Sequence, residues 1–162
     1  MITNYLSPLE FELSIKRLPG VEFFLQRASI PNISSNPTET PSPFNRLYTT
    51  GDKLTYGELS ISFIIDESMS NYLEIYNWME GYSSPQNFDQ YKNLDGSDQG
   101  VFSDITLLIK NSHKNPNIQV LYKDCFPTSL SDVQLDTTQN DIVYPEATVG
   151  FQYNYFKIVN SS

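Results

Sequence analysis

The chain has 162 residues, of which 10 are basic and 19 acidic, giving a net charge of −9. This balance argues against tight binding of nucleic acid, because Lys and Arg supply most contacts to phosphate groups. The length suits one domain with a sizeable core, and the 14% aromatic content favours strands. Cys125 is the one cysteine and His113 the one histidine, which excludes an internal disulfide, a cysteine-rich zinc site and a multi-histidine metal centre.

The first third of the sequence contains strand signals followed by a proline-rich loop. Apolar and polar residues alternate over residues 9–15, which predicts a strand. Residues 18–20 (Leu-Pro-Gly) predict a turn, and residues 21–30 the returning strand of a hairpin. Residues 31–53 begin with four prolines in 13 residues, so neither a helix nor a central strand is expected there. A connection of this length is commonly functional or disordered.

The next segment changes its hydrophobic period from that of a strand to that of a helix. Alternating apolar and polar residues predict a strand over residues 54–65. Apolar residues then recur every three or four positions, which predicts a helix over residues 68–80. Asp66, Glu67 and Ser68 lie between the two and are expected to cap the helix.

The second half predicts three more strands. Residues 82–103 are polar and rich in Gly, Asp and Gln, so a surface loop is expected. Residues 104–110 and 118–124 are predicted to form a hairpin. Residues 126–136 are irregular at first, and residues 147–158 predict one long final strand.

Together these elements predict a mainly β fold in a single domain over residues 1–162. Six or more antiparallel strands would form a β-barrel or sandwich with one flanking α-helix. The side chains on the strand faces opposite the core are short and mostly uncharged, whereas a solvent-exposed strand face commonly carries more Lys and Glu. Such a face is either an ordinary wetted sheet or the wall of a channel. The residues concerned are Ser60, Ser62, Thr106, Gln152 and Asn154, with Glu10 and Glu12.

Motifs for catalysis or metal binding do not stand out in the sequence. Residues 95–100 share part of a calcium-loop pattern, but Thr106 stands where a bidentate Glu is required. His113 is expected in a hairpin tip, without a nucleophile partner, and Cys125 as a small buried hydrophobe. We therefore expect a protein that is not an enzyme and that uses no cofactor or metal. No sequence run approaches the roughly 20 apolar residues of a membrane-spanning helix.

Three segments carry a family resemblance through their order in the chain. They are Gly51-Asp52-Lys53 at the end of the proline-rich loop, Asp66-Glu67 before the helix, and Pro127-Thr128 leading to Leu135-Asp136. In this order, between an alternating strand and a closing aromatic strand, they resemble the tail tube proteins of contractile-tailed bacteriophages. The resemblance runs from about residue 8 to residue 158. The short N-terminal arm and the composition of residues 82–103 depart from the family pattern and leave the particular tube component open.

The resemblance implies a β-barrel-like domain, flanked by a helix, that forms stacked homohexameric rings. The phage genome would pass through the lumen without specific binding, and the tail sheath and the baseplate or initiator proteins would be partners. The protein would lie in the tail of the virion, after assembly in the cytoplasm of the bacterial host. The lumen would be lined by Glu58, Ser60, Ser62, Thr106, Gln152 and Asn154. The loop that reaches a neighbouring subunit would use Pro31, Pro37, Pro41, Pro43, Phe44, Arg46, Tyr48 and Asp52.

Several alternatives stay open at this stage. A baseplate tube initiator, a tail terminator and the tube protein of type VI secretion share the fold. A different class is a small β-sandwich that binds carbohydrate through exposed Tyr and Trp. The aromatic residues lie mostly on apolar strand faces, which argues against that class.

Overall fold

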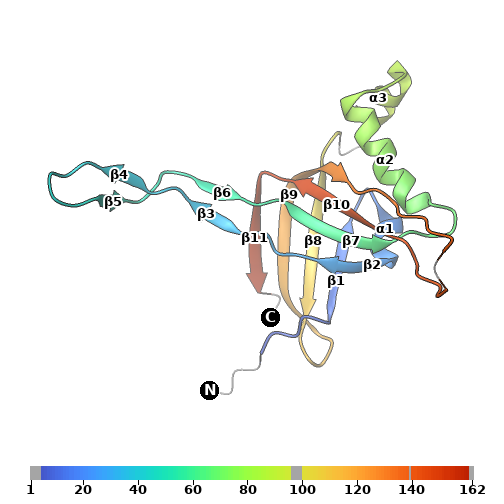
Figure 1. The fold of residues 1–162 in the computed structure, drawn as a ribbon, viewed down its shortest axis with the longest axis horizontal. Coiled ribbons are helices and arrows are strands. Elements are labelled where there is room, and N and C mark those ends of the chain that lie inside the picture. Colours follow the sequence, from blue (N-terminus) through green and yellow to red (C-terminus); the bar gives the residue numbers. More distant parts are fainter. Residues whose placement is uncertain (1–4, 96–99, 139, 161–162) are drawn as a thin grey trace.

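The computed structural model describes residues 5–95, 100–138 and 140–160 (Figure 1). Most of its strands are antiparallel neighbours in one seven-stranded sheet. These strands are β1 (Phe11–Ile15), β2 (Leu25–Ala28), β7 (Leu59–Ile64), β8 (Ser103–Lys110), β9 (Pro116–Leu130), β10 (Glu146–Gln152) and β11 (Tyr155–Asn160). The order is β1-β8-β9-β10-β7-β2, and β11 pairs with the free side of β9.

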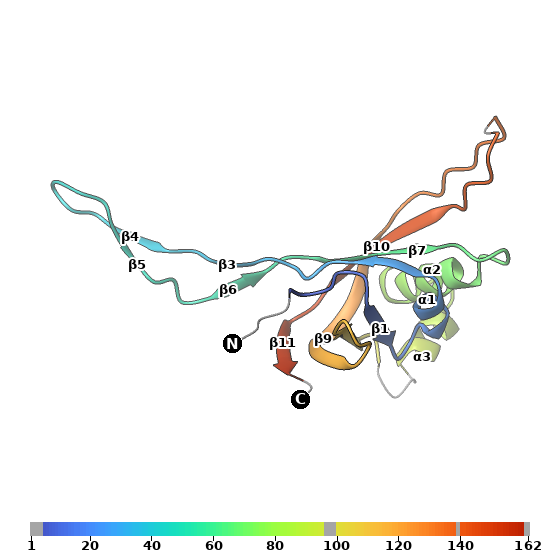
Figure 2. The ribbon, with the colours of Figure 1, turned by 90° about the horizontal axis from the view of Figure 1, so that it is seen from below.

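Strand β9 belongs to two halves of this sheet. Residues 118–123 pair with β11 and lie beside β8, whereas residues 126–130 pair with β10. Between them Asp124 has a positive φ of 55°, a left-handed conformation that Asp tolerates better than most residues. One half therefore contains β1, β8 and β11, and the other contains β10, β7 and β2 (Figure 2). In the described residues β1 and β2 do not pair with each other, so the fold is sandwich-like and not a closed barrel.

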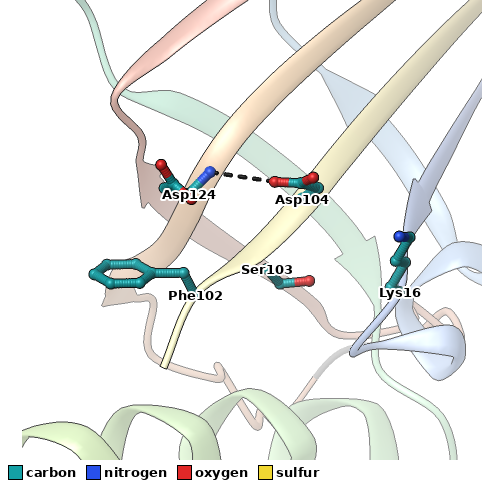
Figure 3. Close-up of a pocket in the computed structure, with 5 residues that line it drawn as sticks. All are labelled: Lys16, Phe102, Ser103, Asp104 and Asp124. Atoms are coloured by element: carbon teal, nitrogen blue, oxygen red, sulfur yellow. Dashed lines mark hydrogen bonds between the residues drawn. The ribbon is translucent and has the colours of Figure 1, made fainter. Parts of the chain in front are cut away.

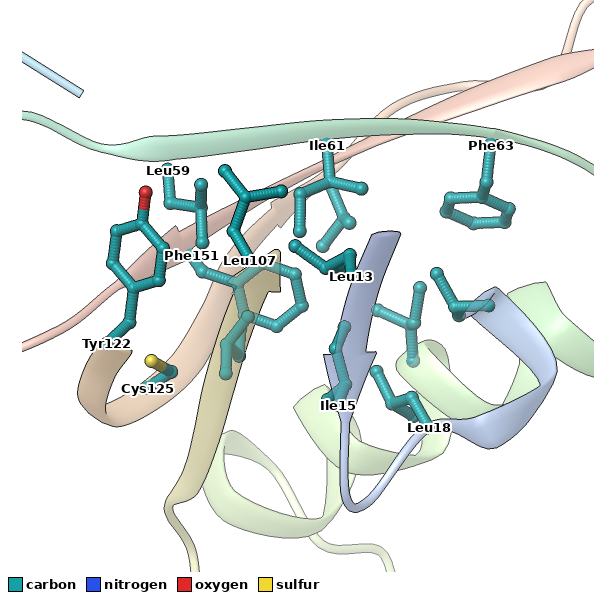
Figure 4. Packing of buried hydrophobic residues seen from close by; sticks show 14 of the residues in the cluster. Leu13, Ile15, Leu18, Leu59, Ile61, Phe63, Leu107, Tyr122, Cys125 and Phe151 are labelled. Atoms are coloured by element: carbon teal, nitrogen blue, oxygen red, sulfur yellow. The ribbon is translucent and has the colours of Figure 1, made fainter. Parts of the chain in front are cut away.

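The core fills the space between the two halves. Leu59, Ile61 and Phe63 are fully buried and point from β7 toward Leu13 and Ile15 of β1 (Figure 4). This outcome confirms the predicted alternation, since successive side chains of a strand point to opposite faces. The mainly β fold predicted from the sequence is confirmed in its sandwich form.

The predicted helix is α2 (Ser70–Ser83), and it covers one end of the core. Its buried side chains include Ile75 and Trp78, so it packs on the sheet as expected. The capping prediction is confirmed for Asp66, whose carboxylate accepts hydrogen bonds from the backbone N–H groups of Ser70 and Asn71 in the first turn. Met69 occupies the N-cap position itself, and its side chain makes no capping hydrogen bond. The Asp66 carboxylate also accepts hydrogen bonds from the hydroxyls of Ser68 and Ser70. The hydrogen bond from the Ser70 hydroxyl is the largest cause that holds the pKa of Asp66 below its ordinary value.

Two segments form helices where the sequence predicted none. Residues 19–23 form α1 (Pro19–Phe23), and only residues 25–28 of the predicted strand 21–30 pair as β2. Pro19 suits the first helical turn, where its missing N–H costs no hydrogen bond, and Leu18 and Val21 reach the core. Part of the expected loop 82–103 forms α3 (Phe88–Asp95), with Asp89 favourably placed in its first turn.

The ends of two strands also differ from the prediction. Residues 126–130, expected to be irregular, continue β9 despite Pro127. The expected single strand 147–158 is two strands, because the chain leaves β10 at Tyr153 and Asn154 and crosses to the other half of the sheet as β11. Tyr153 is buried there, and its hydroxyl donates to the Gly57 carbonyl at 2.8 Å.

The proline-rich loop is an extended two-stranded arm, here called the arm (residues 33–56). Two short antiparallel ladders build it, β3 with β6 near the body and β4 with β5 farther out. The strands are β3 (Ile33–Ser35), β4 (Thr38–Thr40), β5 (Leu47–Thr49) and β6 (Leu54–Tyr56). The prediction of neither helix nor central strand is confirmed, since the arm projects away from the main sheet (Figure 1). Its side chains are almost all exposed, so it has no core of its own.

An aromatic cluster anchors the base of the arm. The Tyr56 ring lies 6.0 Å from Tyr153 and 5.5 Å from Phe156, measured between ring centroids. Tyr122 packs beside the same two rings and is fully buried. Its hydroxyl has no hydrogen-bond partner within the described part of the chain. Burial raises the pKa of Tyr122 far above its ordinary value, that of Tyr153 to about 12, and that of the nearby Cys125 thiol to about 12.

Raising the pH above about 9 is expected to destabilise the fold through these groups. In the unfolded chain Cys125 and the tyrosines ionise near 9.0 and 10.0, whereas the folded chain holds their protons to about pH 12 or beyond. The stabilising contribution is therefore complete below about pH 9 and is lost as the pH rises toward 12. Urea midpoints at about pH 8 and pH 11 test this, and equal midpoints would contradict it. Tyr122→Phe should reduce the loss, and it should raise the midpoint near pH 8 or leave it unchanged, because the hydroxyl that it removes is buried without a hydrogen bond in the described part of the chain.

Candidate functional site

The outward side of β7 forms a polar surface with its neighbours in the same half of the sheet. Ser62 lies directly opposite Thr148 of β10, and their hydroxyls are 2.9 Å apart. Ser60 lies opposite Gly150, which in turn lies opposite Ser129 of β9. We call this surface the polar face; its residues are Glu58, Ser60, Ser62, Thr128, Ser129 and Thr148.

Glu58 lies flat across the polar face. Its Oε1 accepts hydrogen bonds from the Thr128 hydroxyl at 2.6 Å and the Ser129 hydroxyl at 3.4 Å. A Cβ atom at Gly150 would stand 2.0 Å from the same Oε1, so only glycine leaves room for this arrangement. Hydroxyl groups therefore hold the carboxylate along the sheet, and the side chains around it are short and rich in hydroxyls.

The structure brings together only some of the residues predicted to line a lumen. Thr106 pairs with Ser14 and Leu121 on the outer side of the other half of the sheet, so it does not share the polar face. Gln152 is exposed at the end of β10. Asn154 lies beyond that strand, where its amide donates to Asp124 Oδ2 at 2.8 Å.

The sequence analysis missed Thr128 and Ser129 as members of the polar face. Pro127 made their segment look irregular, and only the pairing of β9 with β10 places them beside Glu58. The available signal was that Thr128 and Ser129, and not charged residues, follow Pro127, as on the other polar strand faces. The lumen assignment itself stays a prediction for all of these residues.

The predicted inter-subunit residues fall on the arm, with one exception. Pro31 is buried where the chain leaves the body. Phe44, near the tip, is 94% exposed, and Arg46 beside it forms an exposed ion pair with Glu39 at 3.3 Å. The remaining members of the predicted set, Pro37, Pro41, Pro43, Tyr48 and Asp52, are also exposed on the arm.

An apolar groove of about 720 Å³ lies at the end of β7. Phe24 and Ile64 form part of its wall, and Val133, Leu135 and Tyr144 from the β9–β10 connection form another part. Asp66 and Glu67 line it as well, so the groove combines an apolar wall with two carboxyl groups. We call it the β7 groove.

A smaller pocket of about 170 Å³ lies where β8 meets β9 (Figure 3). Asp104 lines it and accepts a hydrogen bond from the backbone N–H of Asp124 at 3.3 Å. Burial raises the pKa of Asp104, but the hydrogen bond and the charge of Lys123, 2.5 Å away, outweigh burial and hold that pKa below its ordinary value. The carboxylate is thus engaged in a partly exposed ion pair that joins two strands, which is worth about 0.2–1 kcal/mol.

Within residues 5–95, 100–138 and 140–160 no three His, Cys, Asp or Glu side chains gather closely enough to hold a metal ion. Residues 96–99 of the weak calcium-loop pattern lie outside the described residues. Of the helices that the structure describes, none has the length and apolar character needed to cross a membrane.

The profile of a family described as phage tail tube protein matches residues 11–159. The chain belongs to the phage tail tube protein family. The resemblance read from the sequence is thereby confirmed. The tail tube terminator protein of Enterobacteria phage T4 is 26% identical to this chain over 165 residues, which cover 97% of this chain and 90% of that protein.

Solved structures of contractile injection systems share the tail tube fold. The tube-terminating cap of the anti-feeding prophage aligns with a TM-score of 0.71 at 15% identity, covering 99% of this chain and 95% of that one. A chain of the PVC sheath–tube complex, from an extracellular contractile injection system, aligns with a TM-score of 0.68 at 16% identity, covering 96% of this chain and 92% of that one. At these identities the likeness is one of fold.

Proposed function

We propose that this protein is a structural component of a contractile phage tail, forming a homohexameric ring around the channel through which the genome leaves. The family match over residues 11–159 carries this proposal. No catalytic step is assigned to it. The ring would lie in the virion tail after assembly in the host cytoplasm, in contact with neighbouring tube, sheath or baseplate proteins.

The polar face supports a role as channel wall. Its exposed groups are hydroxyls and one carboxylate that is already hydrogen-bonded, so it offers water-binding groups without a cluster of cations. Arg27 of β2, opposite Ser62, is the basic residue at its border. DNA passing such a wall would find few cations to replace its counterions, and binding would be weak.

Within this role, we place the ring at the end of the tube as a terminator. The similarity to the phage T4 tail tube terminator extends over nearly the full length of both chains, which supports this placement. The repeating tube subunit predicted from the sequence is the second candidate, and the fold shared with the PVC sheath–tube complex supports it. The two differ physically: a tube subunit must stack on itself through both ring faces, whereas a terminator stacks through one.

Electron microscopy of the purified protein, alone and with the tube protein of the same phage, tests the proposal. A terminator should form single rings alone and should cap tubes of the partner protein at one end. Long polymers of the protein alone would favour the repeating subunit. A protein that stays monomeric at every concentration, alone and with the tube protein, would refute the ring itself.

A further inference from the structure

The chain carries a projecting arm with exposed apolar side chains near its tip at one end and an apolar groove at the opposite end. Figures 1 and 2 both show the arm leaving one side of the body, while the β9–β10 connection and the end of β7 lie on the other side. The β7 groove lies at this second end. The arm of one molecule therefore points away from its own groove.

The arm exposes large apolar side chains near its tip. Phe44 is 94% exposed, Tyr48 61% and Leu47 55%, all at or near the tip. A two-stranded hairpin is marginally stable alone in water, and exposed apolar patches mark interaction sites. These side chains would become buried only against another surface.

The β7 groove has a matching apolar surface. Leu135 is 84% exposed and Tyr144 67% exposed on its rim, beside Val133 and Ile64. Its volume of about 720 Å³ exceeds that of a single aromatic side chain, so it can accept the end of a hairpin.

The charges of the two surfaces are also complementary. Arg46 is the only charged residue of the arm tip, residues 40–48, and its ion pair with Glu39 just below the tip is exposed and weak enough to be exchanged for another partner. The β7 groove is lined by Asp66 and Glu67 and, among the described residues, by no Lys or Arg, and the β9–β10 connection that supplies part of its wall contains three aspartates and no basic residue in its sequence. The groove end is therefore acidic, and the tip carries the single positive charge.

We propose that the arm tip of one copy docks in the β7 groove of a second copy, with Phe44 in the groove and Arg46 beside Glu67. The inference rests on the proposed self-assembly and names the contact that produces it. A contact between two different surfaces of the same chain is head-to-tail; repeated, it closes into a ring when the rotation between copies closes, and it builds an open filament when it does not. A self-complementary dimer would instead need the same surface on both partners.

Cysteine cross-linking between two differently tagged chains tests the contact. One chain carries Phe44→Cys and the other Leu135→Cys, while the native Cys125 is fully buried and does not compete. Under mild oxidation we expect at least about tenfold more disulfide-linked heterodimer than with Phe88→Cys in place of Phe44→Cys. Phe88 is a matched control, because it is 80% exposed but lies on α3.

A charge reversal provides a second readout. Arg46→Glu should shift assembly to higher protein concentration, and adding Glu67→Arg should restore it. Both positions are exposed, so the urea midpoint should not change. A double variant that assembles no better than Arg46→Glu alone counts against the pairing.

The outcomes separate this contact from the proposed function. If rings form but the Phe44→Cys and Leu135→Cys chains do not cross-link above the control, the docking proposal is overturned and the ring stands. In that case another tail protein covers the groove, or nothing does. If no ring forms and no cross-link appears, both proposals fail.

Discussion

Replacing Trp78 by Ala is expected to lower the free energy of unfolding by about 3–5 kcal/mol, the range for large aromatic residues in cores. Trp78 is 2% exposed and its ring lies 6.0 Å from that of Phe151 in β10. Its indole N–H donates to the Val101 carbonyl at 2.8 Å, and the Arg17 guanidinium lies 5.2 Å from the ring centroid. The substitution leaves a cavity and an unpaired carbonyl, and it removes one of the two buried apolar side chains, with Ile75, that attach α2 to the core.

Urea unfolding followed by far-ultraviolet circular dichroism measures this loss. Domains commonly have about 5–15 kcal/mol of stability, so the variant should be close to unfolding at 37 °C. Phe88→Ala is the control, because its exposed side chain on α3 should cost little. A loss below about 1 kcal/mol at Trp78 would show that α2 is not needed to close the core.

Adding two lysines to the polar face is expected to convert a ring that binds DNA weakly into one that binds it with measurable affinity. In Ser60→Lys with Ser62→Lys, every subunit gains two cations on the outward side of β7, where the wild-type side chains are small hydroxyls. If that side faces the lumen, the assembled ring should bind linear duplex DNA. The logarithm of the affinity should fall linearly with the logarithm of the salt concentration.

The shape of the DNA distinguishes a lumen from an outer surface. A closed circular duplex cannot thread a preassembled ring, so the polar-face variant should bind linear DNA and leave the circle free. Ser14→Lys with Thr106→Lys is a matched control, because these paired residues lie on the outer side of the other half of the sheet. The control should show no preference between linear and circular DNA. Equal binding of linear and circular DNA by the polar-face variant would contradict the assignment of the polar face to the lumen.

The sequence predicts most of the core, because alternation is a local signal. Leu59, Ile61 and Phe63 are all buried as their spacing requires, and the helical spacing that follows them does form α2. The single-helix prediction failed at residues 19–23, where one turn of helix and a turn signal look alike in a short Leu-Pro-Gly stretch.

The assembly surfaces were predictable only in part, because they depend on contacts distant in sequence. The arm was recognisable from its prolines, but its ladders form between short, weakly patterned segments such as residues 38–40 and 47–49. Thr106 carries a short hydroxyl side chain like Ser60 and Ser62. Only the division of β9 between the two halves of the sheet places Thr106 on the outer side of the other half. The β7 groove combines residues 24, 64–67, 69, 133, 135, 144 and 145, so no local pattern could reveal it.

The shared strand β9 also determines how the protein unfolds. Its residues 118–123 hold β11 and lie beside β8, and its residues 126–130 hold β10. Separating one half of the sheet would therefore strip hydrogen bonds from a strand that the other half needs. We expect the amide protons on both sides of Asp124 to exchange with solvent with the same opening free energy, as parts of one cooperative unit, while the amides of the arm exchange far sooner.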